Sequence, residues 1–468
     1  MKFIPNAGLL LSLLATTAFF YSGSGAQTSP LTTLIDRAKG QHPASEMPVL
    51  CVNGHAATAT AAQTITLLQV LGVKCVRIDW NWDAIEHKQQ GRYDWNGNTL
   101  TDPSGPVSFS SYFSEICGAG IQPILLATYN NPLYAAAPFT LISTPINVTG
   151  FNNFGVALAT QAAALKCPNP IIEAFNEPNL TIWTNGEQWT GAAYAPVLAE
   201  FSSAVKANFP GTKVFSGGVS PGPGIMPAPW IKQMVDAGKT FSDVDAFAIH
   251  PYNYHQPAER IPTPAPDQLL LDLKSFKAAS GDSKPIAVTE YGFPRQSVGS
   301  DLRRQGIYVG WAVLDAIIAG VTHFTVYDLV DDGLDYESNG EHSYGLFFSL
   351  KASPGHPVEG AAPHAIKPAG TAFQTVASAM ASATSFRVTR DNAASAVTIA
   401  FEKPEGITFA IWTTETASQK PYSATVGKFS SLTCKDLLGN TAPCRYTDGK
   451  LSASLSATIG PIIATALR

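Results

Sequence analysis

The feature that most constrains the fold is a repeated alternation of two kinds of segment over the first two-thirds of the 468-residue chain. Short apolar runs typical of strands recur, and longer stretches with helical spacing lie between them. The eight apolar runs span residues 48–52, 75–79, 122–127, 171–176, 213–216, 244–250, 285–289 and 323–327. Helical stretches span residues 56–71, 155–166, 194–208, 266–279 and 302–319. Strand–helix alternation favours a parallel sheet, and eight such units fit a closed (β/α)8 TIM barrel of the α/β class.

An open, doubly wound sheet is the alternative arrangement of the same elements. It would place a glycine-rich phosphate-binding loop after an early strand. The segment after the first run is Val52-Asn-Gly-His55, which lacks the GxGxxG spacing, and the sequence contains no GxxxxGK[ST]. The closed barrel is therefore favoured.

The composition and pattern of the sequence change after about residue 378. Short runs rich in Thr, Ser, Val and aromatic residues follow one another at residues 386–389, 396–402, 407–413, 422–426, 445–446, 453–456 and 461–466. Runs of this length, separated by turn residues, are typical of a small antiparallel β-sandwich. We therefore expect a catalytic barrel over residues 27–377 and a β-sandwich over residues 378–468. Residues 30–47 are candidates to complete the sandwich.

The N-terminal segment has the three parts of a secretory signal peptide. Lys2 precedes an apolar stretch over residues 9–20, and small residues then lead to Ala26. A retained membrane anchor is the alternative, but a spanning helix needs about 20 apolar residues. We therefore expect removal of residues 1–26, no membrane span in the mature chain, and an extracellular or periplasmic location.

Composition excludes some classes of partner and cofactor. The formal net charge is −5 and no basic patch stands out, so nucleic acid is not an expected partner. The six cysteines lack CxxC and zinc-finger spacing, and the nine histidines lack HExxH spacing. Neither a metal ion nor an organic cofactor is therefore expected, and nothing in the sequence specifies an oligomeric state.

Export would permit disulfides between the cysteines. We predict a bridge between Cys434 and Cys444, which flank a turn-like segment of the C-terminal region. Cys51 and Cys75 lie on neighbouring predicted strands and could also pair. Buried free thiols are the alternative for all four cysteines outside the predicted bridge.

Acidic residues at the ends of two predicted strands are the candidate catalytic residues. The active site of a barrel of this kind lies at the C-terminal ends of its strands. The fourth run continues into EAFNEPN (residues 173–179) and the seventh into VTEYG (residues 288–292), so Glu177 and Glu290 would project into one cleft. Glycoside hydrolysis needs such a pair, with one carboxyl protonated to donate to the leaving oxygen and the other ionised to act at the anomeric carbon.

These motifs resemble those of the clan A glycoside hydrolases. In that clan, Asn-Glu-Pro closes the acid/base strand, as in EAFNEPN, and the nucleophile strand is similar to VTEYG. Arg77, in VRIDWNW, matches the arginine of the second strand, and His250 and Tyr252, in HPY, match the His-x-Tyr of the sixth. Within the clan, residues 77–95, the EAFNEPN run and DLLGN (residues 436–440) look most like glycoside hydrolase family 39, which joins a barrel to a β-sandwich.

The resemblance implies a role for each matched residue. Glu177 would be the general acid/base, and Glu290 would be the nucleophile of a reaction that retains anomeric configuration. Such enzymes hold the two carboxyl groups about 5–5.5 Å apart. Arg77 would keep Glu290 ionised, Tyr252 would orient it, and His250 would support Glu177 or touch the sugar.

Further residues would shape the substrate site. Asn176 would bond the 2-hydroxyl of the sugar at the cut, and Trp183 is the best candidate for a subsite platform. The clan often has Trp at the end of the eighth strand, where this chain has Tyr327 as a possible substitute. Glu173 is expected to be a buried structural partner, and a structural ion pair is the alternative role for Arg77. Other aromatic candidates, each of which could instead pack beneath a loop, are Trp80, Trp82, Tyr129, Tyr134, Trp189, Tyr254 and Tyr291.

The sequence therefore predicts a secreted, retaining glycoside hydrolase that acts by double displacement on a plant or microbial oligosaccharide or polysaccharide, with β linkages favoured. A transglycosylase on the same site is one alternative. A catalytically inactive, carbohydrate-binding barrel is another, and the presence of both Glu177 and Glu290 argues against it.

Overall fold

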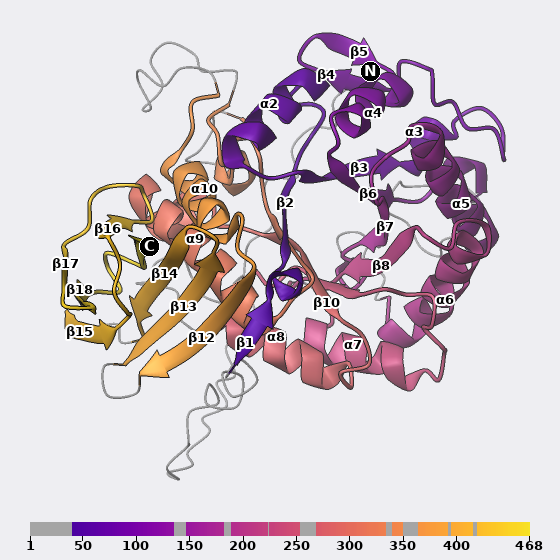
Figure 1. Ribbon diagram of the computed structural model, residues 1–468. Helices are drawn as coiled ribbons and strands as arrows, with labels where there is room; N and C mark the ends of the chain where they lie inside the picture. The colour runs from indigo at the N-terminus through magenta and orange to yellow at the C-terminus, as the bar shows by residue number, and fades with distance from the viewer. Residues whose placement is uncertain are drawn as a thin grey trace.

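The computed structural model describes residues 40–134, 147–181, 189–222, 224–252, 268–333, 339–349, 364–391, 395–414 and 419–468. Helices surround a central barrel of strands, and the C-terminal strands lie together on one side of it (Figure 1). Three predicted features lie outside the described residues: the signal peptide over residues 1–26, the aromatic platform at Trp183 and the aromatic candidate Tyr254. No helix in the described part of the chain is long and apolar enough to cross a membrane.

Eight parallel strands form the barrel, which confirms the predicted fold class. They are β2 (Val49–Asn53), β3 (Cys75–Asn81), β6 (Gln122–Thr128), β7 (Ile171–Asn176), β8 (Lys213–Gly218), β9 (Phe247–Ile249), β10 (Ile286–Tyr291) and β11 (His323–Val326). Their order is β8-β7-β6-β3-β2-β11-β10-β9. Parallel bridges from Phe215 to Ala246 and from Val219 to Ile249 join the two ends of this order and close the barrel. Each predicted apolar run overlaps one of these strands.

The helices that cover the barrel are α2 (Ala61–Leu71), α4 (Phe109–Gly118), α5 (Val148–Ala164), α6 (Gly191–Asn208), α7 (Pro227–Asp236), α8 (Gln268–Ala279), α9 (Leu302–Ala319) and α10 (Pro368–Met380). A short helix, α3 (Trp82–Ile85), and a hairpin of β4 (Leu100–Asp102) and β5 (Gly105–Val107) lie between β3 and α4. Helix α5 begins at Val148 and not at residue 155 as predicted. The reason is a cap, because the Asn147 side chain accepts a hydrogen bond from the Gly150 N–H at 2.8 Å.

The inward-facing side chains change character along the barrel axis. Near the N-terminal ends of the strands they form a buried and mostly apolar set, which we call the lower layer: Cys51, Cys75, Ile124, Ile171, Phe215, Ala246 and Ala287. Alternate residues of a strand point to the same side. Two residues further along β2, β3, β7 and β10, the inward positions therefore carry a polar set, the upper layer: Asn53, Arg77, Glu173 and Thr289, all buried.

The C-terminal strands form two antiparallel sheets. Six strands, in the order β1-β12-β13-β14-β19-β16, make the larger sheet, and β15-β18-β17 make the smaller one. Their bounds are β1 (Gln41–Pro43), β12 (Ser385–Asp391), β13 (Ala396–Lys403), β14 (Gly406–Thr413), β15 (Lys420–Thr425), β16 (Ser431–Asp436), β17 (Cys444–Thr447), β18 (Lys450–Leu455) and β19 (Ile462–Leu467). The N-terminal strand β1 pairs with β12, so chain from before the barrel adds an edge strand to this sheet.

The larger sheet packs directly on the barrel helices. Ile399 of β13 and Trp412 of β14 belong to the same buried cluster as Leu314 of α9 and Phe373 of α10. One continuous core therefore joins the two parts of the molecule, and other buried residues of the C-terminal sheets form a separate, smaller cluster that includes Ile411.

All six cysteines form disulfides, so the free-thiol alternative is wrong. The predicted Cys434–Cys444 bridge is confirmed and joins β16 to β17. Cys51 pairs with Cys75 and ties β2 to β3 inside the lower layer. The third bridge joins Cys117, near the end of α4, to Cys167, just beyond α5.

Candidate active site

Five of the predicted site residues come together at the C-terminal ends of the barrel strands. Arg77 lies in β3, Asn176 ends β7 with Glu177 directly after it, His250 follows β9, and Glu290 lies in β10. Their exposed fractions range from 0% for His250 to 9% for Glu290. The side chains are therefore largely withdrawn from solvent, where electrostatic interactions are stronger than in water.

Arg77 connects the two sides of this site. Its Nε and Nη2 donate to Glu173 at 2.6 and 3.3 Å, and its Nη1 donates to Glu290 Oε1 at 2.6 Å. Nη1 also donates to Asn53 Oδ1 at 2.9 Å, and Nη2 donates to Asn176 Oδ1 at 3.1 Å. Burial lowers the pKa of Arg77, but the carboxylates of Glu173 and Glu290 raise it by more, so the guanidinium stays charged. The same side chain thus makes both the structural ion pair and the contact to Glu290.

Glu173 is a fully buried structural carboxylate, as its position within the fourth strand suggested. Besides Arg77, it accepts hydrogen bonds from the Gly218 N–H at 3.1 Å and from Thr289 Oγ1 at 2.9 Å. Burial raises the pKa of Glu173, but Arg77 and His250 lower it by more, to about 2. Glu173 therefore remains ionised and holds Arg77 in place.

Glu290 is surrounded by donors. Arg77 donates to its Oε1, Tyr252 donates its hydroxyl to Oε2 at 3.2 Å, and His250 Nδ1 lies 3.5 Å from Oε2. Burial raises the pKa of Glu290, the charges of His250 and Arg77 lower it, and the nearby Glu177 raises it again, with a net upward direction. Two carboxyls that interact this closely titrate as a pair.

Glu177 stands opposite Glu290 at short range. One carboxylate oxygen of each, together with a ring nitrogen of His250, lie within 4.8 Å of one another. The backbone here is unusual, because φ is 81° at Phe175 and 45° at Glu177, in a region that residues other than glycine seldom adopt. The Glu177 N–H donates to the Gly218 carbonyl at 3.0 Å, which holds this turn. Strained positions of this kind cluster at functional sites.

His250 links the carboxyl pair to the upper layer. Its Nε2 lies 3.0 Å from Thr289 Oγ1, and that hydroxyl donates its proton to Glu173. Nε2 must therefore carry a proton and donate it to Thr289, which leaves Nδ1 to face Glu177 Oε1 at 3.0 Å. Burial lowers the pKa of His250, but Glu290, Glu173 and Glu177 raise it by more, to about 9.

Asn176 and Tyr327 line the same site. Asn176 donates from Nδ2 to the Tyr129 hydroxyl at 3.3 Å, while its Oδ1 accepts from Arg77. Tyr327 directly follows β11 and precedes a cis peptide bond. Its ring packs edge-on against Tyr344, with centroids 5.2 Å apart. The tyrosine therefore occupies the position where a clan tryptophan was expected.

Several aromatic candidates are buried in the core and do not line the cleft. Trp80 and Trp82 are fully buried and Tyr291 is 3% exposed. Trp80 packs against Phe113, with ring centroids 4.2 Å apart. These three residues are therefore packing residues, whereas Tyr129 does reach the site through Asn176.

The sequence interpretation missed Thr289, which sets the tautomer of His250, and it missed the grouping of three charged residues near Tyr327. These are His55, Asp328 and Asp332, which gather at the ends of β2 and β11. Burial, followed by the charge of Asp332, raises the pKa of Asp328 well above its ordinary range. The signal that could have found His55 and Asp328 is the one that found the glutamates, namely a polar residue just beyond a barrel strand.

Comparison with known proteins identifies the fold. A family 39 glycoside hydrolase from Bacteroides cellulosilyticus WH2 matches with a TM-score of 0.63 and 22% identity over 91% of this chain and 82% of that one. A β-xylosidase from Caulobacter crescentus CB15 matches with a TM-score of 0.60 and 14% identity over 92% of this chain and 98% of that one. AbfB, a family 51 α-L-arabinofuranosidase from Bifidobacterium longum, matches with a TM-score of 0.59 and 12% identity over the same shares.

These structures share the fold of this chain, in which an eight-stranded parallel barrel is joined to C-terminal antiparallel sheets. No protein-family profile matches the sequence, and no curated protein is significantly similar to it.

Proposed function

We propose that this protein is a secreted, retaining glycoside hydrolase that cleaves O-glycosidic bonds, with β linkages favoured, in an oligosaccharide or polysaccharide. The observation that carries the proposal is the placement of Glu177 and Glu290, whose oxygens approach within 4.8 Å. Retaining enzymes hold the two carboxyls about 5–5.5 Å apart, whereas inverting enzymes need about 6.5–9.5 Å to admit a water molecule. The observed gap suits direct attack by a carboxylate on the sugar.

The surroundings of the two carboxyls support a different role for each. Glu290 accepts from the guanidinium of Arg77 and from Tyr252, and both contacts favour its ionised form. Burial and the charge of Glu177 act the other way and raise the pKa of Glu290, so the pair shares one proton. The two donors to Glu290 favour placing that proton on Glu177, beside His250 Nδ1. Glu290 is accordingly the nucleophile and Glu177 the general acid.

In the first step, a Glu290 oxygen attacks the anomeric carbon as the bond to the leaving oxygen breaks. Glu177 transfers its proton to that oxygen, and the sugar becomes an ester of Glu290. Glu290 loses its negative charge at this point, yet Arg77 remains paired with Glu173 at 2.6 Å. The second carboxylate therefore prevents the buried guanidinium from being left without a counter-charge.

In the second step, Glu177 removes a proton from a water molecule, which attacks the anomeric carbon and releases Glu290. Two inversions at the same carbon restore the original configuration. His250 Nδ1 lies 3.0 Å from Glu177 and positions this carboxyl in both of its protonation states. Because Nε2 donates its proton to Thr289 throughout, only Nδ1 can change between accepting a hydrogen bond from protonated Glu177 and donating one to ionised Glu177.

Asn176 is placed to recognise the sugar at the cut. Its Oδ1 is occupied by Arg77, so the amide orientation is set and Nδ2 carries the donors. A donor here would bond the 2-hydroxyl of the sugar, a contact that strengthens in the transition state.

Two further observations support secretion and the substrate class. All six cysteines are paired in disulfides, which persist in oxidising compartments. Proteins of the same fold include a β-xylosidase and an arabinofuranosidase, so sugars of plant or microbial polysaccharides are the first substrates to test.

The test is a screen of the purified mature protein on aryl β-glycosides and polysaccharides, beside Glu177→Gln and Glu290→Gln. Glu115→Gln, at an exposed position on α4, is the matched control. Removal of a general acid costs on the order of 10²–10⁴ in rate, and loss of the nucleophile should cost at least as much. Equal turnover by wild type and Glu290→Gln would refute the mechanism. Sugar binding without turnover on any substrate would favour a carbohydrate-binding protein.

A further inference from the structure

A second group of charged side chains lies at the ends of the neighbouring strands β2 and β11. His55 lies two residues beyond β2, and Asp328 lies two residues beyond β11. Asp332 follows on the same loop as Asp328. The Leu329 N–H donates to the Asn53 carbonyl at 2.8 Å, so the two strand ends are held side by side.

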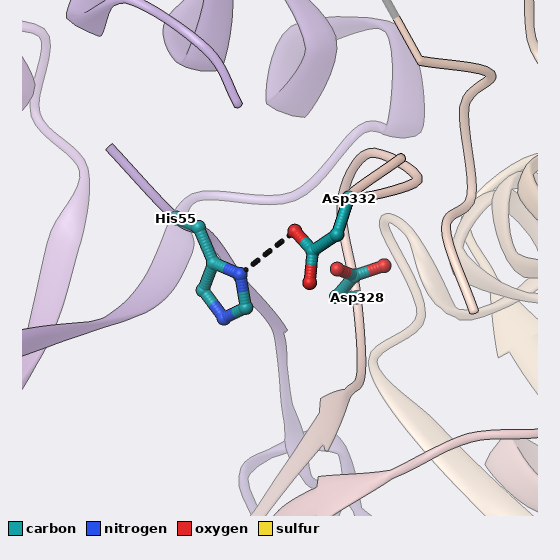
Figure 2. Close-up of side chains that lie close together, drawn as sticks. All are labelled: His55, Asp328 and Asp332. Carbon is teal, nitrogen blue, oxygen red and sulfur yellow. Dashed lines mark hydrogen bonds and ion pairs between the residues drawn. The ribbon is translucent and has the colours of Figure 1, made fainter. Parts of the chain in front are cut away.

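The three side chains converge on one small space. Figure 2 shows the His55 ring facing the carboxylate of Asp332, with the carboxylate of Asp328 beside it. His55 Nδ1 lies 3.0 Å from Asp332 Oδ1. One ring nitrogen of His55 and one oxygen of each aspartate all lie within 4.8 Å of one another.

Asp328 is the member of the group whose burial is not explained by protein partners. The residue is 2% exposed. Its Oδ1 is buried and has no hydrogen-bond partner among the residues that the structure describes. A buried carboxylate oxygen is costly unless it is paired or coordinates a metal ion. A nearby side-chain cation, Lys367 at the start of α10, donates instead to Asp331 at 2.7 Å.

We propose that His55, Asp328 and Asp332 form a binding site for a divalent first-row transition-metal ion, such as Zn²⁺ or Mn²⁺. One imidazole nitrogen and two carboxylate oxygens suit these ions, whereas Ca²⁺ prefers six to eight oxygen ligands. Metal–ligand distances of about 2.0–2.2 Å require the three donor atoms, which now lie within 4.8 Å of one another, to move closer together when the ion binds.

The proposed site has room for additional ligands. The His55 and Asp332 side chains are 28% and 21% exposed, so part of the coordination sphere faces solvent. Tyr327 separates the group from the catalytic carboxyls, since its ring centroid lies 5.6 Å from that of His55 and 6.5 Å from that of Tyr252. The ion is thus distinct from the hydrolytic chemistry, which uses only Glu177 and Glu290.

The test is titration of the chelator-treated, full mature protein with Zn²⁺ in a calorimeter, with Ca²⁺ as the comparison ion. We expect one equivalent of Zn²⁺ to bind, and Ca²⁺ to bind much more weakly. Asp328→Asn keeps the shape of the side chain and should weaken binding at least about tenfold, since even residues that only support a ligand contribute about 10–100-fold. His87→Gln, which alters a half-exposed histidine 3.7 Å from Asp94, should leave binding unchanged.

Two controls keep the result decisive. The only other such group in the described residues is Glu177, His250 and Glu290, so Glu290→Gln is titrated in parallel. Binding lost in Glu290→Gln but kept in Asp328→Asn would overturn the proposal. So would the absence of stoichiometric Zn²⁺ binding, or preferential binding of Ca²⁺. If Asp328→Asn fails to fold, Asp332→Asn at the partly exposed position replaces it, with the same tenfold loss expected.

Discussion

The upper and lower layers of the barrel occupy the same strands two residues apart, yet they are built from different chemistry. In the lower layer, Ile171 packs among Cys51, Phe215 and other buried side chains, and a disulfide crosses it. Two residues along the same strand, Glu173 is equally buried but takes part in a network of ion pairs and hydrogen bonds. Burial is thus the same in both layers, and the partners are what differ.

The lower layer therefore contributes mainly to the stability of the barrel, whereas the upper layer also supports the charged groups of the candidate active site. Apolar burial in the lower layer stabilises the fold without regard to pH or charge. A charged group of the upper layer destabilises the fold when its partner is removed, because an uncompensated buried charge is costly. Changes in the lower layer should therefore alter stability alone, and changes in the upper layer should alter stability, activity and their pH dependence together.

The largest expected effect comes from removing the cation of the upper layer. Arg77→Met would leave Glu173 and Glu290 buried without their common partner. We expect a loss of about 3–5 kcal/mol in the free energy of unfolding, as for other broken buried ion pairs. We also expect loss of glycosidase activity. Urea denaturation measures the first effect, and a loss below about 1 kcal/mol would show that the network is not a source of stability.

The next effect comes from opening the lower-layer disulfide. Replacing Cys51 and Cys75 with serine removes a bridge across 24 residues of sequence. Disulfides typically contribute about 2–4 kcal/mol. Because neither residue contacts the carboxyl pair, turnover per folded molecule should stay unchanged at temperatures well below unfolding. A large drop in kcat with intact folding would contradict the separation of the layers.

Two buried histidines, His323 beside the lower layer and His250 beside the upper layer, should make opposite contributions to the pH dependence of stability. His323 packs against Phe215, with ring centroids 5.1 Å apart. Its ring nitrogens have no hydrogen-bond partner in the described part of the chain. Burial, together with Lys213, lowers the pKa of His323 from 6.5 to about 4. Its contribution to stability is therefore present above pH 6.5 and lost as the pH falls from 6.5 towards 4.

His250, which contacts Thr289 of the upper layer, has the opposite effect on the pH dependence of stability. Burial lowers the pKa of His250, but Glu290 and the other carboxylates raise it by more, from 6.5 to about 9. The contribution of His250 to the stability of the fold is therefore present below pH 6.5 and is lost as the pH rises to 9. Thermal unfolding across this pH range should show both losses. His323→Leu should remove the loss between pH 6.5 and 4 and leave the alkaline one. An unchanged acid limb in this variant would assign that limb to other groups.

The smallest effect is expected for Ile171→Val, which removes one methylene from the lower layer. Truncations of this kind cost about 0.5–1.5 kcal/mol. The substitution lies two residues from Glu173 on the same strand, so it tests whether the layers are coupled. We expect unchanged kcat and pH profile, and a shifted pH optimum would show coupling that the packing does not suggest.

Much of the barrel could be predicted because its strands are continuous apolar runs between polar loops. Strand β16 was not among the predicted runs because Ser431–Asp436 contains no Val, Ile or aromatic residue, and half of its residues are exposed. Helix α7 was missed because Pro227 and Pro229 make its start look like a loop, although proline is well tolerated in the first turn of a helix. Local patterns therefore identify buried elements better than edge strands and proline-rich helix starts.

Only part of the site could be predicted in the same way. Glu177, Glu290 and Arg77 each stand in a recognisable motif at a strand end. His55 and Asp332 are 277 residues apart, and they meet only because closure of the barrel places β2 beside β11. Thr289 has no motif either, since its role depends on the geometry of its hydroxyl between His250 and Glu173.

The most direct measurement is the anomeric configuration of the first-formed product, followed by proton NMR during hydrolysis of a β-glycoside that the protein turns over. The carboxylate oxygens of Glu177 and Glu290 lie within 4.8 Å, which matches the short carboxyl separation of retaining enzymes and not the longer one by which inverting enzymes admit a water molecule. Retention is therefore expected, with the β anomer appearing first and the α anomer only later by mutarotation. Initial appearance of the α anomer would mean inversion by a single displacement, and it would contradict the assignment of Glu290 as the nucleophile.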